Sequence, residues 1–333
     1  MINVIYIERE VLTHPRTEQI CARFPQASKT VCERYGEVFN PKGQNFRLQK
    51  RRPGLILAKK RDPYVLPVPD GYGVGADHNF YFSHMLNCIY DCRYCFLQGM
   101  YRSAHYVLFV NYEAFADAIV QSANELSDQS PIWFFSGYDG DSLAYEPVTG
   151  FVEFLLSTFQ KLPGAFLELR TKSTQIRSLL DRAPLHNVVI AFSFTPRPVG
   201  KILENKVPAI EKRIAAAAQL QDRGWSVGLR FDPLIYYEDY KAGYTELFAD
   251  VFAQIDPQHC HSVTFGPFRL PQDYFRTLLK LYPAEPLFAG PLTREEKMVT
   301  YRPELESAML ADCRSLLANY VGERQLFPHA VTG

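Results

Sequence analysis

The sequence lacks the features of a secreted or membrane-bound protein. Its opening residues, MINVIYIEREV, contain no basic segment followed by an apolar run, so they do not resemble a signal peptide. No stretch approaches the roughly eighteen consecutive apolar residues that mark a membrane-spanning helix. The cysteine count is 7, and an odd number argues against a full set of disulfides. We therefore expect a cytoplasmic protein with reduced cysteines and no membrane segment.

The chain also lacks an excess of charge of either sign. Its 36 Lys and Arg residues balance 36 Asp and Glu residues, for a formal net charge of zero. That balance excludes a coat of positive charge for indiscriminate nucleic-acid binding, but it leaves room for a local basic groove. No exposed apolar stripe stands out, so we expect a monomer. Apolar residues make up 47% of the 333 residues, enough for a sizeable core.

From about residue 78 onward, apolar runs alternate with helical stretches. The runs predict strands at His78–Ser83, Ile132–Ser136, Phe166–Arg170, Val188–Ser193, Ser226–Phe231 and Ser262–Phe265. Between and after them we predict helices near Tyr112–Leu126, Val148–Gln160, Thr174–Leu180, Pro208–Asp222, Tyr244–Ala253 and Gln272–Leu281. Such alternation indicates βα units and a parallel sheet. The fold class is therefore α/β, a partial (β/α)6 barrel of TIM type with its chemistry at the carboxyl ends of the strands.

The segments that flank this barrel have a different composition. Residues 1–75 are rich in proline and basic residues, and we expect an irregular N-terminal extension that packs on a barrel of residues 76–285. Residues 286–333 are expected to supply substrate contacts and a C-terminal helical segment. One face of that helix carries Leu305, Met309, Cys313, Leu316, Leu317 and Tyr320. By this pattern Cys313 is a core residue rather than a ligand.

One apolar run in the N-terminal extension stands between two groups of cations. Gly54–Ala58 follows Arg47, Lys50, Arg51 and Arg52, and it precedes Lys59, Lys60 and Arg61. A strand bracketed in this way either faces phosphates or forms a solvated surface hairpin. The sequence supports the two interpretations equally.

Three cysteines at CxxxCxxC spacing form the most informative stretch of the chain. Cys88, Cys92 and Cys95 lie in one loop directly after the first predicted barrel strand, and an aromatic residue, Phe96, follows them. A 4Fe–4S cluster normally takes four thiolates, so three leave one iron open. S-adenosylmethionine can fill that position, and the loop resembles that of radical S-adenosylmethionine enzymes. In that chemistry the cofactor carries the reaction while the protein positions it.

A zinc ion is the alternative metal that the same three cysteines could bind. Zinc sites favour paired CxxC motifs, and a fourth ligand would have to come from Cys260, Cys313 or a histidine. On that interpretation the chain is a noncatalytic, zinc-stabilised nucleic-acid-binding protein.

Several further segments resemble the spore photoproduct lyase family, over almost the whole chain. The resemblance rests on Val4-Ile5-Tyr6-Ile7-Glu8, Cys92-Arg93-Tyr94-Cys95-Phe96-Leu97-Gln98, Leu169-Arg170-Thr171-Lys172, Phe192-Ser193, Asp232-Pro233-Leu234 with Glu238, and Thr264-Phe265 ahead of Arg269. It implies repair of a methylene-bridged thymine dimer in damaged DNA by a 5′-deoxyadenosyl radical. The lesion would be turned out of the base stack to reach the cofactor. A flavodoxin- or ferredoxin-type electron donor is implied as a partner.

The resemblance also implies roles for particular residues around the cofactors. Cys88, Cys92 and Cys95 are implied as ligands of the 4Fe–4S cluster. Contacts to S-adenosylmethionine are implied for Lys172, Ser193, Ser136 and Asp232. Lysine is suited to the methionyl carboxylate, and serine to a hydroxyl or carboxylate. Tyr94 is implied in radical relay beside the cluster.

A second group of residues is expected to contact the substrate. The resemblance implies lesion or backbone contacts at Arg269, Tyr301, Arg302 and Glu238. The segment Gly140-Asp141-Ser142 adds Asp141 and Ser142, because acidic and hydroxyl groups at a strand end suit ribose binding or substrate orientation, although an exposed turn has the same composition.

Two departures from the family pattern bear on the reaction. The hydrogen-donating cysteine of the family aligns with Tyr138, and no cysteine occurs between Cys95 and Cys260. The family's second cluster-loop tyrosine is Phe96 here. Either Tyr138 is the hydrogen donor, since its O–H bond resembles a thiol S–H bond in strength, or the substrate radical has a different fate. In the latter case the chain is a paralogue that acts on RNA, a nucleotide or a small metabolite.

Overall fold

The computed structural model describes residues 2–69, 74, 76–126 and 131–328. Its largest sheet is the predicted barrel wall, in the order β18-β14-β13-β11-β10-β9-β5-β4. All neighbours in it are parallel except β4 (Leu66–Pro67), which is antiparallel to β5. The parallel strands are β5 (His78–Phe82), β9 (Ile132–Ser136), β10 (Ala165–Thr171), β11 (Val188–Ser193), β13 (Ser226–Leu234), β14 (Cys260–Pro267) and β18 (Leu326–Pro328). The six predicted strands and the α/β partial barrel are confirmed.

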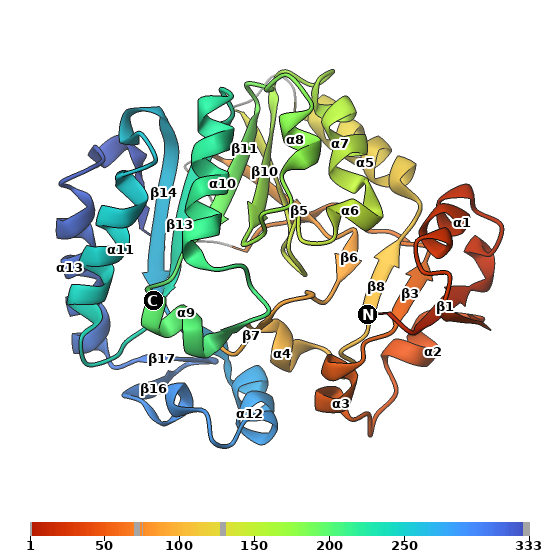
Figure 1. Ribbon diagram of the computed structural model, residues 1–333, viewed down its shortest axis with the longest axis horizontal. Coiled ribbons are helices and arrows are strands. Elements are labelled where there is room, and N and C mark those ends of the chain that lie inside the picture. The colour runs from red at the N-terminus through yellow and green to blue at the C-terminus, as the bar shows by residue number, and fades with distance from the viewer. Residues whose placement is uncertain (1, 70–73, 75, 127–130, 329–333) are drawn as a thin grey trace.

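Helices cover the outer side of this curved sheet (Figure 1). They are α5 (Tyr112–Glu125), α6 (Glu146–Thr149), α7 (Phe151–Phe159), α8 (Arg177–Leu180), α10 (Ile210–Asp222), α11 (Tyr240–Phe252) and α13 (Pro303–Leu317). Helix α9 (Arg197–Leu203) lies instead near the carboxyl ends of the strands, beside β12 (Glu204–Asn205). Cys313 of α13 is fully buried, as its helical spacing predicts. No helix in the described residues is long and apolar enough to cross a membrane.

The first 75 residues are not irregular, which corrects the expectation from their composition. Strands β1 (Val4–Glu8), β2 (Ser28–Cys32) and β3 (Leu55–Ala58) join β8 (Tyr106–Phe109) and β6 (Met85–Leu86) in a second sheet, in the order β2-β1-β3-β8-β6. Helices α1 (Pro15–Ala22), α2 (Gly36–Phe39) and α3 (Phe46–Arg51) accompany it at the right of Figure 1. The extension is therefore a sheet completed by two strands from the central part of the chain.

The apolar run between the two groups of cations is a buried strand. All four residues of β3 are inaccessible to solvent, because β1 and β8 pair with its two edges. Neither a phosphate-facing strand nor a surface hairpin is correct for this run. Parallel strands buried on both faces appear as continuous apolar runs. The apolar run itself therefore indicated burial of β3, whereas the flanking cations did not indicate whether the strand is exposed.

Beyond residue 285 the chain contains more than a helix. Strands β16 (Leu292–Glu295) and β17 (Met298–Tyr301) form an antiparallel sheet with β15 (Arg269–Pro271), and β18 extends the barrel wall beside β14. Helix α12 (Gln272–Leu281) lies between these elements and α4 (Leu97–Met100), the helix that follows the cysteines (Figure 1). Residues after 285 therefore help to enclose the strand ends.

Candidate active site

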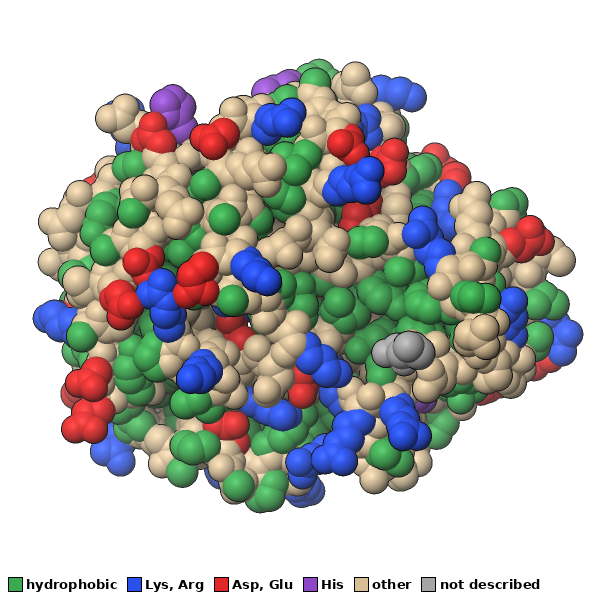
Figure 2. Space-filling model, viewed as in Figure 1, with side chains coloured by type: hydrophobic (Ala, Val, Ile, Leu, Met, Phe, Trp, Pro, Cys, Tyr) green, Lys and Arg blue, Asp and Glu red, His purple; other side chains and the backbone are tan. Residues whose placement is uncertain are grey.

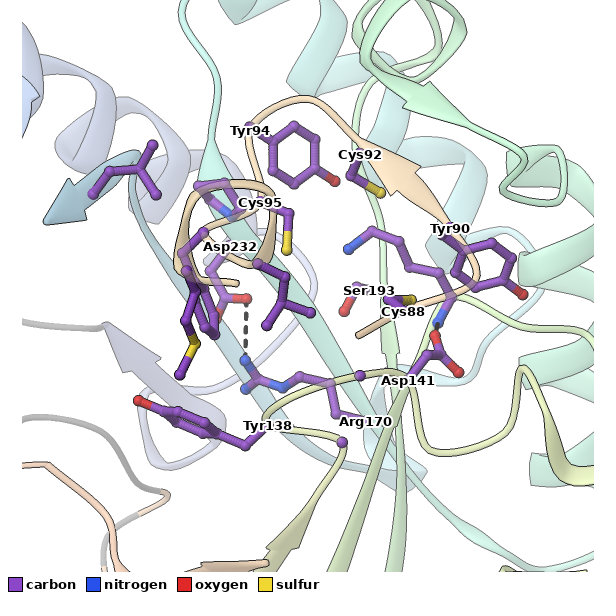
Figure 3. A pocket seen from close by; sticks show the side chains of 18 of the residues that line it. Cys88, Tyr90, Cys92, Tyr94, Cys95, Tyr138, Asp141, Arg170, Ser193 and Asp232 are labelled. Carbon is purple, nitrogen blue, oxygen red and sulfur yellow. Dashed lines mark hydrogen bonds and ion pairs between the residues drawn. The ribbon is translucent and has the colours of Figure 1, made fainter. Parts of the chain in front are cut away.

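The carboxyl ends of the barrel strands open onto a cavity of about 520 Å³ (Figure 3). Its wall combines strand-end residues of β9, β10, β11 and β13 with the cysteine loop and with the segment from Gly266 to Tyr274. This is the end of a parallel barrel at which catalytic residues gather, and the volume suits a small-molecule ligand.

The three predicted cysteines all line this cavity. Their sulfurs surround one part of it from different sides in Figure 3, and none forms a disulfide. Burial raises the pKa of Cys88 to about 12, and the nearby Asp141 carboxylate adds to the effect. Burial likewise raises the pKa of Cys92 and of Cys95. These thiols become thiolates when a metal cation compensates the desolvation, so they fit a buried metal cluster.

The arrangement suits a cluster better than a single zinc ion. Within the described residues, no three His, Cys, Asp or Glu side chains converge as the ligands of one ion do. None of the suggested fourth ligands lines the cavity, since no histidine is among its described lining residues. The Cys260 thiol donates to the Val227 carbonyl, and Cys313 is a buried residue of α13. Three thiols spread around a common space match three corners of a 4Fe–4S cube with the fourth corner open.

The cysteine loop is held in place by segments that are distant in sequence. Its strand β7 (Asp91–Cys92) pairs with β12 (Glu204–Asn205), and the Arg93 N–H donates to the Leu203 carbonyl at 2.8 Å. The Lys50 ammonium, from α3, donates to the Cys88 carbonyl at 2.9 Å. These contacts fix the loop backbone from two sides.

Helix α12 supports the loop from a third side. Gly99 of α4 packs so closely that an added Cβ would lie 2.6 Å from the Tyr274 carbonyl oxygen. The Tyr282 hydroxyl, just after α12, donates to Gln98 at 3.0 Å in a buried position. The glutamine that contributes to the family resemblance therefore anchors the loop to residues near the carboxyl terminus.

Tyr94 lines the cavity, and its hydroxyl takes part in a buried polar network. Its hydroxyl donates to the Glu204 carboxylate, which also accepts from Arg213 at 2.7 Å and from Thr195 at 3.0 Å. Lys172 lines the cavity with its ammonium 4.0 Å from the same carboxylate and 5.6 Å from the centre of the Tyr94 ring. Burial alone would raise the pKa of Glu204, but Arg213 and Lys172 hold it below its usual value.

Three more predicted cofactor contacts line the cavity. Among the described residues, the buried Ser136 hydroxyl at the end of β9 has no hydrogen-bond partner. Such an atom is costly unless a ligand completes its bonding. Ser193 ends β11 on the same wall. Asp232 differs, because it accepts a hydrogen bond from Thr264 at 2.8 Å and lies 3.5 Å from Arg170.

Tyr138 lines the cavity where the family's cysteine is expected. Its ring stacks on Tyr81 at a centroid distance of 4.3 Å and contacts Phe96 at 5.9 Å. Gly137 precedes it with a φ of 87°, a left-handed turn in which a Cβ would collide with Ser142. Tyr138 lines the cavity beyond Arg170, and in Figure 3 its hydroxyl is turned away from the three cysteines.

Asp141 lines the cavity, but its carboxylate is occupied by the protein. One oxygen accepts from the Leu143 and Ala144 N–H groups and from the Thr171 hydroxyl, and the other accepts from the Lys172 N–H at 2.7 Å. These bonds tie the loop after β9 to the end of β10. Asp141 therefore orders the strand ends, in an arrangement with few free lone pairs for a substrate.

The remaining predicted substrate contacts are not brought together. Arg269 lines the cavity, whereas Ser142, Glu238, Tyr301 and Arg302 do not. Tyr301 is 1% exposed, and its hydroxyl accepts from the Tyr236 N–H at 2.8 Å. Glu238 and Arg302 lie on the surface outside the cavity.

The cavity also contains charged residues that the sequence analysis did not select. They are Lys50, Glu168 and Arg170. Glu168 and Arg170 lie at alternate positions of β10, and Lys172 directly follows the strand in the same alternation, so all three line the cavity. Charged residues at alternate positions of an otherwise apolar strand are a sequence signal that could have identified Glu168 and Arg170 as cavity residues. Lys50 had none, because its burial depends on the cysteine loop folding over it.

Fold and site together define a class: a partial parallel barrel with a CxxxCxxC loop at its strand ends, as in radical S-adenosylmethionine enzymes. A model of the family described as "Spore photoproduct lyase" matches residues 77–303, so the chain belongs to the spore photoproduct lyase family.

Individual relatives agree with this assignment. The chain is 24% identical over 269 residues to the spore photoproduct lyase of Bacillus subtilis (strain 168), covering 79% of this chain and 76% of the relative. It is 20% identical over 279 residues to that of Geobacillus sp. (strain Y412MC61), covering 79% of this chain and 76% of that relative.

Solved structures confirm the fold over the whole chain. A mutant spore photoproduct lyase with bound AdoMet and dinucleoside spore photoproduct superposes with a TM-score of 0.85 at 19% identity. The match covers 100% of this chain and 99% of that one. A spore photoproduct lyase complexed with dinucleoside spore photoproduct gives a TM-score of 0.81 at 18% identity, covering 99% of this chain and 98% of that one.

Proposed function

We propose that this protein is a radical S-adenosylmethionine lyase that acts on a damaged pyrimidine in DNA, a thymine dimer of the spore-photoproduct type. The observation that carries the proposal is the convergence of three buried thiols on one cavity at the strand ends, in a chain of this family. When bound, the 4Fe–4S cluster and S-adenosylmethionine supply the electron and the 5′-deoxyadenosyl radical that start such a reaction.

The cavity residues divide between the two cofactors. Cys88, Cys92 and Cys95 hold the cluster through their thiolates. The Lys172 ammonium is suited to the methionyl carboxylate, and the Ser136 hydroxyl gains in the ligand the partner that it lacks in the protein. Ser193 contributes a third polar contact from the next strand end. Among the predicted cofactor contacts, Asp232 is the least able to accept further hydrogen bonds, because its carboxylate already interacts with Thr264 and Arg170.

Tyr138 acts in this proposal as the hydrogen donor to the substrate radical. The step moves one hydrogen atom from the phenolic O–H to the thymine carbon, which leaves the radical on Tyr138. Its place in the cavity and its stacking on Tyr81 support the role, since a stacked ring is held in one orientation. Phe96 contacts the same ring but has no hydrogen to donate, and the Tyr94 hydroxyl is committed to Glu204.

Substrate binding in this proposal depends mainly on Arg269. It is the one member of the predicted substrate set, apart from Asp141, that lines the cavity, and a guanidinium pairs well with phosphate. We further propose that the protein works as a monomer in the cytoplasm with a flavodoxin- or ferredoxin-type electron donor.

The test uses anaerobically reconstituted and reduced protein with S-adenosylmethionine and an oligonucleotide that contains the thymine dimer. We expect 5′-deoxyadenosine and restored thymine together in wild type. In Tyr138→Phe we expect deoxyadenosine without thymine, and in Tyr138→Cys we expect thymine again. If the wild-type protein forms 5′-deoxyadenosine but does not restore thymine, the thymine dimer is not its substrate. Zinc without iron or sulfide in the reconstituted protein would refute the radical chemistry.

The tyrosine at position 138 also favours a second candidate, a radical enzyme of the same family that acts on RNA, a nucleotide or a small metabolite. The affinity of the protein for duplex DNA as a function of salt separates the two. A DNA enzyme must bind less tightly as salt rises, because phosphate contacts release counterions. Salt-independent or undetectable DNA binding would support the second candidate.

A further inference from the structure

The outer side of the cysteine loop carries a group of cations that does not belong to the cavity. We call Arg47, Arg51, Arg52, Arg93 and Lys206 the basic band. Figure 2 shows Lys and Arg side chains gathered in the lower part of this face, over the region of α3, α4 and β7. None of the five residues lines the cavity.

Side-chain contacts connect members of the basic band that lie on separate elements. Arg47 and Arg93 both lie over the ring of Tyr282, with Cζ at 5.7 and 4.0 Å from its centre. The Lys206 ammonium donates to the Lys50 carbonyl at 2.9 Å, next to Arg51 in the chain. The band therefore runs from α3 across the cysteine loop to the turn after β12.

The positive charge of this band is mostly not compensated within the protein. Arg93 lies 3.4 Å from Asp91, but no ion pair with a described residue exists for Arg47, Arg51, Arg52 or Lys206. Several other surface arginines are paired, including Arg9 with Glu33, Arg61 with Glu10, Arg197 with Glu211 and Arg314 with Glu323. In a chain of zero net charge, the band is thus a local source of positive potential.

The band lies one layer of residues from the cluster ligands. Arg93 stands between Cys92 and Cys95, and the Tyr282 ring that it covers is bonded to Gln98 of the same loop. On the other side, Lys50 links Lys206 to the Cys88 carbonyl. A molecule bound to the band would be close to the cluster and would leave the cavity to the substrate.

Exposed apolar side chains close in sequence to two members of the band favour a protein partner over a nucleic acid. Leu48, next to Arg47, is 57% exposed, and Ile202, four residues before Lys206, is 62% exposed. Interfaces between proteins combine apolar contacts with a charged rim that steers association, whereas a phosphate backbone gains nothing from exposed leucine or isoleucine.

We propose that the basic band is the docking surface for an acidic one-electron carrier protein, and this inference rests on the proposed function. In the complex, one electron passes from the reduced carrier to the oxidised cluster, so the carrier is oxidised by one electron and the cluster is reduced by one. No proton or group is transferred. Charge steering makes the encounter fast and dependent on salt, as expected for a transient redox complex.

The test compares two charge-reversal variants in reconstituted protein. Arg47→Glu combined with Arg51→Glu alters the band, and Lys161→Glu combined with Arg223→Glu makes the same change in charge at two exposed cations that precede barrel strands β10 and β13. Stopped-flow absorbance follows cluster reduction by reduced flavodoxin, and separately by dithionite. The single variant Lys206→Glu provides a second probe of the band.

We expect flavodoxin to reduce the band variant about ten-fold or more slowly than wild type at low salt, with dithionite reduction and duplex-DNA affinity unchanged in both variants. The Lys161 and Arg223 variant should match wild type, and high salt should remove the difference. Equal flavodoxin rates in all proteins would overturn the docking surface while the cluster remains. A loss of DNA affinity instead would identify the band as a nucleic-acid surface. Absence of iron and sulfide would refute the proposed function itself.

Discussion

Single buried polar atoms affect which ligand the cavity binds. Ser136 and Ser142 can be compared directly, because both are buried serines near the end of β9. Both have buried hydroxyls with no hydrogen-bond partner among the described residues. Only Ser136 lines the cavity. The first hydroxyl can be satisfied by a ligand in the cavity, whereas the second has no ligand within reach.

Ser136→Ala is therefore expected to weaken S-adenosylmethionine binding about three- to ten-fold, the loss of one hydrogen bond, without lowering the free energy of unfolding. Ser142→Ala should leave the affinity unchanged. Isothermal titration of the reconstituted protein measures both, and urea unfolding checks stability. Equal affinity in wild type and Ser136→Ala would remove this residue from the cofactor site.

A buried ion pair between two single residues contributes to the stability of the barrel. Glu168 and Arg230 form an ion pair of 2.6 Å with both side chains inaccessible to solvent. Arg230 also donates to Ser262, so the pair belongs to a bonded network across three strands. Burial alone would raise the pKa of Glu168, but Arg230 and Arg170 hold it below its ordinary value of 4.5.

Glu168→Ala should lower the free energy of unfolding by about 3–5 kcal/mol, because Arg230 is left buried without its partner. Since the folded pKa of Glu168 is lowered, its stabilisation is present above pH 4.5 and is lost as pH falls through the folded pKa. Urea unfolding at several pH values should show a shallower acid dependence in the variant. Glu33→Ala, in an exposed pair, should change little, and an equal loss in both would contradict the argument.

At the scale of elements, the site depends on how closely α4 and α12 approach. The approach requires Gly99, where a Cβ would lie 2.6 Å from both the Tyr274 carbonyl oxygen and Leu278. α4 begins two residues after Cys95, so a movement of this helix also moves that proposed cluster ligand. Packing between these two helices thus helps to position the Cys95 thiol.

Gly99→Ala should lower the free energy of unfolding by about 1–3 kcal/mol through overpacking, and it should reduce the iron and sulfide bound after reconstitution. Gly164→Ala is the control, because no atom of the described residues lies within 4 Å of its added Cβ. Iron and sulfide analysis with urea unfolding measures both variants. Full cluster content in Gly99→Ala would show that the loop tolerates separation of the helices.

At the scale of the whole molecule, the N-terminal sheet and the barrel form one structural unit. β3 pairs with β8, which follows the cysteine loop, and β6 connects β8 to the strand that begins the barrel. Lys50 of α3 reaches the backbone of Cys88. A boundary near residue 75 therefore separates sequence segments rather than independent bodies.

A chain truncated to residues 76–333 should accordingly fail to fold cooperatively, because β8 would lose the partner that covers its edge. We expect aggregation in size-exclusion chromatography and loss of a sharp thermal transition in circular dichroism. The full chain is the control. A truncated monomer with an unchanged melting temperature would show that residues 76–333 fold independently of the N-terminal extension.

The sequence by itself determined the barrel and the position of the cysteine loop at its strand ends. Six strands and the cysteine loop were readable because they are local patterns: apolar runs at βα intervals, and three thiols within one short loop. Strand-end positions then brought Lys172, Ser193 and Ser136 to one cavity, since the carboxyl ends of parallel strands meet.

Only the tertiary structure decided which polar residues face the cavity and which are bonded to the protein. The oxygens of Asp141 are bonded by groups up to 31 positions away in sequence, and Tyr94 is bonded by Glu204, 110 positions away. The burial of Lys50 and of β3 likewise depends on segments that fold over them. Composition near a residue reports its neighbours in the chain, whereas burial and hydrogen bonding depend on neighbours in space.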